Sequence, residues 1–307
     1  MKEQLTKILN DTSIFDKNSI PQKINVGFTN SLFSVDDKYI IKICKNKENE
    51  NKFLKEIEFY KHNENNSYIP KLYSYHVSEN EKDYSYIVIE FVKGKTLYNV
   101  WHTLDEKERK EVIENIVNLM KSFHSIKWKR YDWSNYIKDK LIHNFNFCRE
   151  KNIFTSSELE LAEYILKNMN KYLASNDFRL IHSDIHFDNI IMKEDKSLKL
   201  IDFETSMYAP IDYELDIFLR MCRNPLKYAS EEEEKLIDIN DYKMIEPYFR
   251  KLYPEIFEIH DFEIRNKIYD LESNLRLLPR FPENIELKDI VIKDLNDLKK
   301  YMNESKL

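Results

Sequence analysis

Glycine is almost absent from this chain, which has only Gly27 and Gly94 among its 307 residues. A Walker A loop or a G-x-G-x-x-G dinucleotide fingerprint needs several glycines within a few residues, and neither pattern is present. Glycine serves where the backbone needs a positive φ or a close approach to a ligand. Both positions therefore mark places where the chain has a special backbone requirement.

Cysteines and long apolar runs are also scarce. The three cysteines (Cys44, Cys148 and Cys222) lie far apart with no C-x-x-C spacing. This excludes a disulfide framework or a paired-cysteine zinc site and favours a reducing compartment. No segment approaches the length of about 18 apolar residues that a membrane helix needs, and residues 1–13 lack the apolar core of a signal peptide. We therefore expect a cytoplasmic chain with no membrane partner.

An excess of basic residues is missing as well. The formal net charge is −6, which gives no support to nucleic acid as a partner. Hydrophobic residues make up 42% and charged residues 33%, as in folded globular proteins. Residues 1–94 are neutral, so the whole negative charge falls on 95–307. This acidic part either attracts a cationic substrate or simply forms a soluble surface, and both interpretations stay open.

The first ninety residues predict a small, mostly antiparallel sheet with one inserted helix. Residues 48–62 place Phe53, Ile57 and Tyr60 at helical spacing. Short segments rich in β-branched and aromatic residues, separated by polar turns, are typical of strands. They are 22–27, 31–36, 38–44, 71–78 and 84–92.

Beyond Gly94 the sequence favours helices. Asp105 and Glu108 form a capping-box pattern at the start of a helix over 105–126. Further helices are predicted over 134–150, 156–174, 230–252, 261–278 and 286–303. We predict an α+β fold with two lobes, a nucleotide-binding lobe over 1–94 and a larger helical lobe over 95–307. The hinge is expected at about 90–94.

One island without helical character, residues 178–204, carries the chemistry. It contains HSDIHFDN at 182–189 and then LIDFE at 200–204. The spacing H-x-D-x-x-x-x-N, followed by a strand that ends in D-F, matches the catalytic loop and metal-binding signature of kinases. Phosphoryl transfer needs a carboxylate near the attacking hydroxyl and two oxygen ligands for Mg²⁺. Asp184 is the candidate base, and Asn189 and Asp202 are the candidate magnesium ligands.

Two apolar runs connect these ligands. Residues 190–192 and 198–201 are expected to pair as a hairpin, which brings Asn189 and Asp202 to the same end. The alternative is that these polar residues simply form a turn. That alternative does not account for the matching features upstream.

Lys42 is the main upstream feature. It lies in the apolar strand YIIKIC, where a lysine is costly unless a carboxylate pairs with it. Glu56 and Glu58 in the following helix are both candidates, and we favour Glu56 because it lies nearer the buried face. Lys42 would then hold the nucleotide phosphates; an edge-strand lysine that prevents aggregation is the alternative.

Two further segments are candidates for nucleotide contact. The turn at 27–31 joins two strands and would cover the phosphates with backbone N–H groups, although an ordinary hairpin turn would look the same. The extended segment at 90–92 would hydrogen-bond the edge of adenine or guanine. The candidate residues are Gly27, Phe28, Thr29, Asn30, Ser31, Glu90, Phe91 and Val92.

These motifs together resemble those of aminoglycoside phosphotransferases and their relatives, which include choline and fructosamine kinases. HSDIHFDN resembles the family's H-G-D-L-H-x-x-N loop, and residues 27–31 resemble its G-G-x-x-N loop. FVKGKTL at 91–97 resembles its hinge, and LMKSFHSI at 119–126 the end of its first large helix. The resemblance covers residues 22–220 in order. Phe28 and Ser183 stand where the family has glycine.

The resemblance implies a bilobal, protein-kinase-like fold, Mg²⁺, ATP or GTP as donor, and a small molecule with a hydroxyl group as acceptor. It assigns Asp184 as catalytic base, Lys42 and Glu56 to the phosphates, and Asn189 and Asp202 to magnesium. His124 and His182 are interpreted as structural residues. We expect a monomer or a weak dimer.

An aminoglycoside antibiotic is the acceptor that we expect, because a polycation suits the acidic second part of the chain. Choline, another amino-alcohol or a sugar remains an alternative. The acidic residues proposed for this contact are Glu204, Asp212, Asp216 and Glu272.

Three other functions remain to be compared with this one. A regulatory pseudokinase would be favoured by the loss of a catalytic residue, and none of the four (Lys42, Asp184, Asn189, Asp202) is lost. A protein kinase would need a long activation segment, and only a short stretch separates Asp202 from Asp212. A helical interaction module leaves the 178–204 island unexplained.

Overall fold

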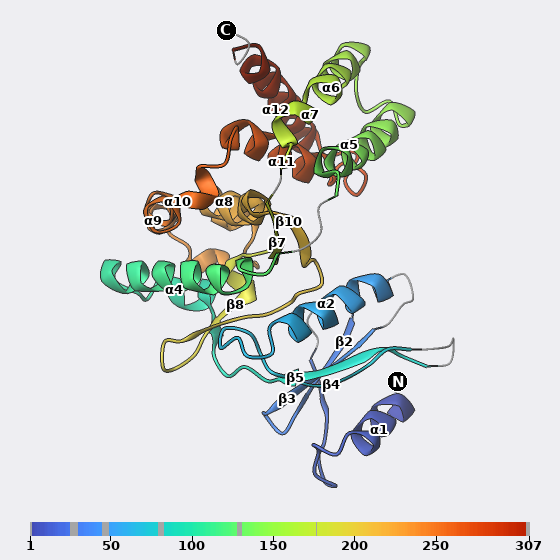
Figure 1. Cartoon of the computed structure of the whole chain (residues 1–307), viewed down its shortest axis with the longest axis vertical. Helices are drawn as coiled ribbons and strands as arrows, with labels where there is room; N and C mark the ends of the chain where they lie inside the picture. Colours follow the sequence, from blue (N-terminus) through green and yellow to red (C-terminus); the bar gives the residue numbers. More distant parts are fainter. Residues whose placement is uncertain are drawn as a thin grey trace.

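A five-stranded antiparallel sheet forms the N-terminal part of the computed structural model (Figure 1). The structure describes residues 2–24, 30–44, 49–78, 83–127, 131–175 and 177–304. The strand order is β1-β2-β3-β5-β4. The strands are β1 (Gln22–Ile24), β2 (Asn30–Val35), β3 (Tyr39–Cys44), β4 (Leu72–His76) and β5 (Tyr86–Glu90).

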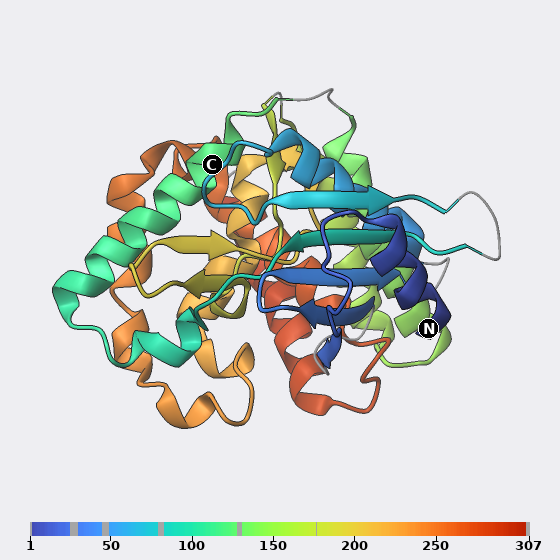
Figure 2. The ribbon, with the colours of Figure 1, turned by 90° about the horizontal axis from the view of Figure 1, so that it is seen from below.

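Helices cover both faces of this sheet. Figure 2 shows α1 (Lys2–Asp11) crossing the face nearest the viewer, where Ile8 packs with Ile41, Ile43 and Val88. Helix α2 (Glu50–His62) lies on the other face. Since side chains alternate along a strand, Lys42 points to the α2 side. This alternation places a lysine beneath a helix that carries acidic residues.

The rest of the chain is mostly helical, as expected. In Figure 1, α4 (Glu106–His124) lies next to the small strands, and α5, α6, α11 and α12 gather at the far end. These four helices share one buried cluster, which includes Leu141, Ile165, Ile268 and Leu295. The remaining helices are α3 (Leu97–Trp101), α5 (Trp133–Glu150), α6 (Ser156–Asn168), α7 (Asn170–Leu173), α8 (Leu215–Arg223), α9 (Ile245–Leu252), α10 (Pro254–Phe257), α11 (Phe262–Leu275) and α12 (Ile285–Glu304).

The segment 178–204, which the sequence predicted to be non-helical, forms short strands between these helices. Strand β8 (Ile190–Met192) pairs with β9 (Leu198–Leu200), and Ile190 lies opposite Leu200. The hairpin prediction is therefore confirmed. Strand β6 (Lys95–Thr96) adds to β8, while β7 (Phe178–Ile181) pairs with β10 (Met207–Pro210).

The helix predicted over 230–252 is wrong for most of its length. Short 3-10 turns occupy Glu234–Leu236 and Ile239–Tyr242, and only α9 at the end is helical. Four consecutive glutamates follow Ser230. Glu233 turns inward and accepts hydrogen bonds from Ser230 and from the distant Asn99 of α3, a tertiary contact that the local pattern does not show. The helices α1, α3, α8 and α10 were not predicted.

None of the described helices is both long enough and apolar enough to span a lipid bilayer.

Gly94 lies where the chain passes from the sheet to β6. A Cβ atom at this residue would lie 2.5 Å from the carbonyl oxygen of Met192 and 2.6 Å from Cγ2 of Ile191. The absence of a side chain thus allows the linking segment to approach β8.

We therefore expect Gly94→Ala to lower the free energy of unfolding by about 1–3 kcal/mol, because the added methyl group overpacks against backbone. Urea denaturation of the variant and of Lys93→Ala, an exposed neighbour, would measure this. Equal stability of Gly94→Ala and the wild type would contradict the close approach.

Candidate functional site

Lys42 is the centre of a buried ion cluster. Its Nζ lies 2.8 Å from Oε2 of Glu56, 2.7 Å from Oε1 of Glu204 and 3.3 Å from Oδ1 of Asp202. The side chain is only 7% exposed. Strand β3 supplies the lysine and α2 supplies Glu56, so the structure brings together the pair that the sequence favoured.

The charges of this cluster are strongly perturbed. Burial disfavours the charged lysine, but the three carboxylates outweigh it and raise the pKa of Lys42 above its usual value. Burial raises the pKa of Glu56 to about 7, against the opposing charge of Lys42. Three acids around one ammonium group leave an excess of negative charge. A group that brings additional positive charge is therefore favoured here.

Asn30 extends the cluster towards the start of β2. Its amide nitrogen donates a hydrogen bond to Oε1 of Glu204. Asn30 and Ser31 are both buried, while Gly27, Phe28 and Thr29 lie outside the described residues. The predicted phosphate loop is thus seen only at its end, next to Lys42.

Two hydrogen bonds link Asn189 to Asp184 and to Ile201, the residue before Asp202. The amide nitrogen of Asn189 donates to the carbonyl of Asp184 (2.9 Å), and the backbone N–H of Ile201 donates to the carbonyl of Asn189 (2.9 Å). The side chain of Asp184 is 37% exposed. Burial and the nearby charge of Asp202 raise the pKa of Asp184 to about 7. A carboxyl group with such a pKa is suited to exchanging protons near neutral pH.

Asn189 and Asp202 fit a hard cation. The Asn189 amide nitrogen also lies 3.1 Å from Nε2 of His186, and burial lowers the pKa of His186 to about 4, so the imidazole ring is neutral. With its N–H groups engaged, the amide presents its oxygen to a ligand. Burial opposes the ionised form of Asp202, but Lys42 and His182 outweigh it and lower its pKa. An amide oxygen and a carboxylate suit Mg²⁺ with phosphate oxygens completing its shell. No group of three or more His, Cys, Asp or Glu in the described ranges could hold a metal alone.

Two residues of the site have left-handed backbone. Ser183 has φ 62° and Asp202 has φ 64°, a region that disfavours residues other than glycine. The Ser183 hydroxyl donates to the carbonyl of Thr205 (2.7 Å), and the Thr205 hydroxyl donates to the carbonyl of His182 (3.0 Å). These two bonds connect the backbone of 182–183 to Thr205.

The buried carboxylate of Glu214 binds the backbone of the loop at 182–189. Its oxygens accept the backbone N–H groups of His182 (2.7 Å) and Ser183 (2.8 Å), and Nε2 of His124 lies 3.1 Å away. The other His124 nitrogen contacts the hydroxyl of Tyr253. The structural role expected for both histidines fits this geometry. The sequence analysis missed Glu214, whose only signal was its place in the acidic turn 212–216.

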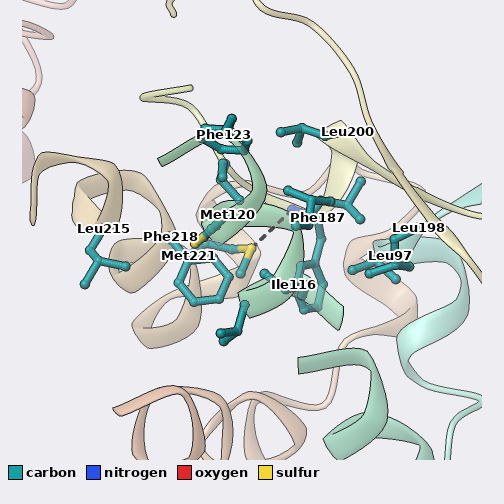
Figure 3. Packing of buried hydrophobic residues seen from close by; sticks show 14 of the residues in the cluster. Leu97, Ile116, Met120, Phe123, Phe187, Leu198, Leu200, Leu215, Phe218 and Met221 are labelled. Atoms are coloured by element: carbon teal, nitrogen blue, oxygen red, sulfur yellow. Dashed lines mark hydrogen bonds between the residues drawn. The ribbon is translucent and has the colours of Figure 1, made fainter. Parts of the chain in front are cut away.

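Phe187 anchors the loop in the hydrophobic core. Figure 3 shows its ring among Ile116 of α4, Leu97 of α3 and Met221 of α8. Its backbone N–H points to the Met221 sulfur at 3.3 Å. Apolar packing therefore fixes the middle of the loop, and Asp184 and Asn189 flank it on the polar side.

Residues 90 and 91 of the predicted hinge make hydrogen bonds and an ion pair with neighbouring segments. The amide of Glu90 donates to the carbonyl of Lys71 and that of Phe91 to Lys38. The Glu90 carboxylate lies 3.1 Å from Nζ of Lys199 in β9. For Val92, no backbone N–H bond is found within the described residues.

The residues proposed for acceptor contact are placed differently. Arg265 pairs with both oxygens of buried Asp212 (2.6 and 2.9 Å). Asp216 is buried and accepts from the hydroxyl of Ser273 (2.6 Å), and Glu272 is buried 3.4 Å from Nζ of Lys140. Glu204 alone belongs to the cluster around Lys42.

Replacing Glu214 should loosen the catalytic loop. In Glu214→Gln one accepting oxygen becomes a donor that faces a backbone N–H, so we expect a loss of about 1–3 kcal/mol in the free energy of unfolding. Hydrogen exchange should accelerate at the amides of His182 and Ser183. Glu263→Gln, at an exposed glutamate, is the control; unchanged exchange at both amides would contradict the role of Glu214.

Asp216 should make stability depend on pH. Burial raises its pKa to about 7, with Arg220 opposing. The stabilisation from this group is complete below its unfolded pKa of about 4 and is lost as pH rises through 7. From about pH 5 to about pH 8 the wild type should therefore lose about 2 kcal/mol more stability than Asp216→Asn. Urea denaturation would measure the free energy of unfolding of both proteins at both pH values. The same difference between the wild type and Asp216→Asn at both pH values would refute this prediction.

Comparison with known structures agrees with the overall fold. The chain resembles the ADP-bound aminoglycoside phosphotransferase APH(2'')-Ib, with a TM-score of 0.68, 18% identity and 97% of each chain covered. A streptomycin-ATP-APH(2")-IIa ternary complex gives a TM-score of 0.67 at 18% identity, covering 98% of this chain and 96% of that one. The GDP complex of aminoglycoside 2'-phosphotransferase-IIIa gives 0.61 at 13% identity, covering 99% of each. At these identities the likeness establishes the fold.

No curated protein sequence matches the chain. The sequence model of the phosphotransferase enzyme family, in contrast, matches residues 21–234. This match includes Lys42, the catalytic loop and Asp202, and it extends over more than half of the chain. The protein therefore belongs to the phosphotransferase enzyme family.

Proposed function

We propose that this chain is a magnesium-dependent kinase that transfers the γ-phosphoryl group of ATP or GTP to a hydroxyl group of a small molecule. The observation that carries the proposal is the cluster of Lys42 with Glu56 and Asp202, which the β8–β9 hairpin brings to the same end as Asn189 and its partner Asp184. Kinases need these groups at these relative places. None of them is lost, which argues against a pseudokinase.

In the proposed reaction Asp184 accepts the proton of the acceptor hydroxyl. The hydroxyl oxygen then forms a bond to the γ-phosphorus, and the bond from that phosphorus to the β,γ-bridging oxygen breaks. The electron pair leaves with the nucleoside diphosphate, and the products are a phosphate monoester and a proton. Lys42 binds the phosphates, while Glu56 holds the lysine in place. Positioning and charge neutralisation supply most of the rate.

Asn189 and Asp202 are the residues that would hold Mg²⁺, whose positive charge offsets that of the phosphates. Nucleotide phosphates would compete with Glu204 for Nζ of Lys42.

The purine would bind at the hinge. We place the boundary between the lobes at 90–94, where β5 ends and β6 begins, and we assign the backbone of 90–92 to the purine edge. Because the amides of Glu90 and Phe91 are engaged within the sheet, Val92 is the donor for the base. The other predicted phosphate-binding residues, Gly27 to Ser31, would cover the phosphates.

The acceptor is a separate question. Structural neighbours include complexes with streptomycin, gentamicin and hygromycin B, and this likeness makes an aminoglycoside the first acceptor to test, with antibiotic resistance as the associated role. The chain's own support for a polycation was the set Glu204, Asp212, Asp216 and Glu272. Three of these are buried in internal contacts, so the support now rests on the likeness alone. Choline, an amino-alcohol or a sugar stays an alternative.

Two variants test the reaction. Asp184→Ala should lower acceptor-dependent turnover by about 10²–10⁴-fold with nucleotide affinity nearly unchanged, whereas Lys42→Ala should weaken nucleotide binding. A coupled assay for nucleoside diphosphate with ATP or GTP, Mg²⁺ and a panel of hydroxyl acceptors would measure turnover, and calorimetry would measure nucleotide binding.

Asp195→Ala, at an exposed position in the turn between β8 and β9, is the matched control and should behave as wild type. Nucleotide binding by the wild type that Lys42→Ala leaves intact would contradict the assigned phosphate site. Near-normal turnover by Asp184→Ala would remove the assigned base.

A further inference from the structure

A cavity of about 390 Å³ lies between α2 and the segment formed by β7, β10 and the start of α5. In Figure 1, α2 lies between the five-stranded sheet and β10, so the cavity wall combines residues from both parts of the chain. Ligand-binding cavities in proteins have volumes of about 300–1,000 Å³. This cavity therefore has room for a small molecule. Ring side chains make up much of its lining, namely Phe59, His62, Tyr131, Tyr136 and Tyr208.

The floor of the cavity is apolar and buried. Phe59 is 1% exposed and Leu180 is 3% exposed, and both line the cavity. The Phe59 ring stacks on the ring of Phe203, with 4.2 Å between the ring centres. This stacking fixes the orientation of Phe59, so the floor is already formed in the absence of a ligand.

The aromatic sides of the cavity are also held in place. The Tyr131 hydroxyl donates to the carbonyl of Tyr208 (2.9 Å), and the Tyr136 ring stacks on that of Trp133, with 5.2 Å between the ring centres. Nζ of Lys140 lies 5.0 Å from the centre of the Tyr136 ring, so this ring already has a cation as its neighbour. A rigid aromatic wall of this kind favours an aromatic ring as the occupant over a simple cation.

Two opposite charges lie at the rim of the cavity. Lys55 and Glu58 line it from α2 and are both exposed. Within the described part of the chain, neither of them makes an ion pair or a hydrogen bond. Glu58 was the second candidate partner of Lys42, a role that Glu56 fills. Residues three apart on a helix have Cβ atoms about 5–6 Å apart, so one small zwitterion can reach both side chains.

The cavity is separate from the proposed catalytic groups. Its lining includes none of Lys42, Asp184, Asn189 and Asp202. Helix α2 contributes to both places, because it supplies Glu56 to Lys42 and other residues to the cavity. A ligand in the cavity therefore has contacts of its own and does not need to displace a nucleotide.

We propose that this cavity binds a small aromatic molecule that carries both an ammonium group and a carboxylate, which is to say an aromatic amino acid. The ring packs against Phe59 and the tyrosine side chains, where aromatic pairs prefer ring centres about 4.5–7 Å apart. Glu58 binds the ammonium group and Lys55 binds the carboxylate. A ligand with only one of the two charges would meet a like charge at the rim. The proposal does not depend on the kinase function proposed above.

The test is a calorimetric titration of the full chain with probes that differ in one feature at a time. L-tryptophan has an indole ring and both charges, tryptamine has the ring and the ammonium group, and indole-3-propionate has the ring and the carboxylate. Indole has neither charge, and glycine has both charges without a ring. None of these probes has an alcohol group, so none is an acceptor in the proposed reaction. Each titration would be made with and without Mg²⁺ and a non-hydrolysable ATP analogue.

We expect L-tryptophan to bind more tightly than the other four probes, whether or not the nucleotide analogue is present. Glu58→Gln should weaken the binding of L-tryptophan and tryptamine by about 3- to 10-fold, the range of an ion pair at an exposed rim. The same variant should not weaken the binding of indole-3-propionate. Lys55→Gln should show the opposite selectivity, because it removes the partner of the carboxylate.

Two exposed residues provide the matched controls. They are Lys61→Gln and Glu64→Gln, which remove the same charges at positions that do not line the cavity. Lys61 lies over the Tyr75 ring instead, 4.2 Å from its centre. Both controls should bind L-tryptophan as the wild type does.

Three results would overturn the proposal. The first is L-tryptophan that does not bind or binds no more tightly than glycine, and the second is a probe with a single charge that binds as tightly as L-tryptophan. The third is binding that the nucleotide analogue displaces or that both Glu58→Gln and Lys55→Gln leave unchanged. If the nucleotide analogue does not bind, the kinase function is rejected, and the titrations without nucleotide still test the cavity.

Discussion

The buried charge of Lys42 is the constraint on which the rest of the site depends. An ammonium group within an apolar sheet is stable only when carboxylates surround it. Satisfying it requires Glu56 from α2 and both Asp202 and Glu204 from beyond β9. One side chain thus connects the sheet, the helix above it and the segment that carries the proposed magnesium ligand Asp202. The same cluster holds more acid than base, which suits the positive charge that would accompany the proposed nucleotide.

A second buried charge positions the catalytic loop. Glu214 has no exposed surface, and its oxygens are used by two backbone N–H groups and by His124. This arrangement fixes the backbone at Ser183, whose positive φ would otherwise be unfavourable. Hydrophobic packing of Phe187 then completes the anchoring (Figure 3). Asp184, the proposed base, is therefore held by groups that have no role in the proposed chemistry, as a preorganised site requires.

The acidic residues around α11 stabilise the fold and do not form a surface for a cationic acceptor. Family membership and the likeness to aminoglycoside phosphotransferases concern the scaffold. The acidic residues that made a polycation attractive serve instead as partners of Arg265, Ser273 and Lys140. The net charge of a sequence does not predict the charge of a ligand-binding surface, because acidic residues that pair with cations inside the protein do not contribute to that surface.

The sequence by itself determined the α+β class and the hairpin of β8 and β9, and it predicted the set of Lys42, Asp184, Asn189 and Asp202. Local spacing and strand alternation are sufficient for these, since both act over a few neighbouring residues. Only the tertiary structure decided that Glu214 supports the loop, that 230–244 does not form a helix, and that Asp212 and Glu272 pair with cations inside the fold. These depend on contacts between residues far apart in the chain, such as Glu214 with His182 and Glu272 with Lys140. The local sequence pattern does not predict which distant charged residues will pair in the protein interior.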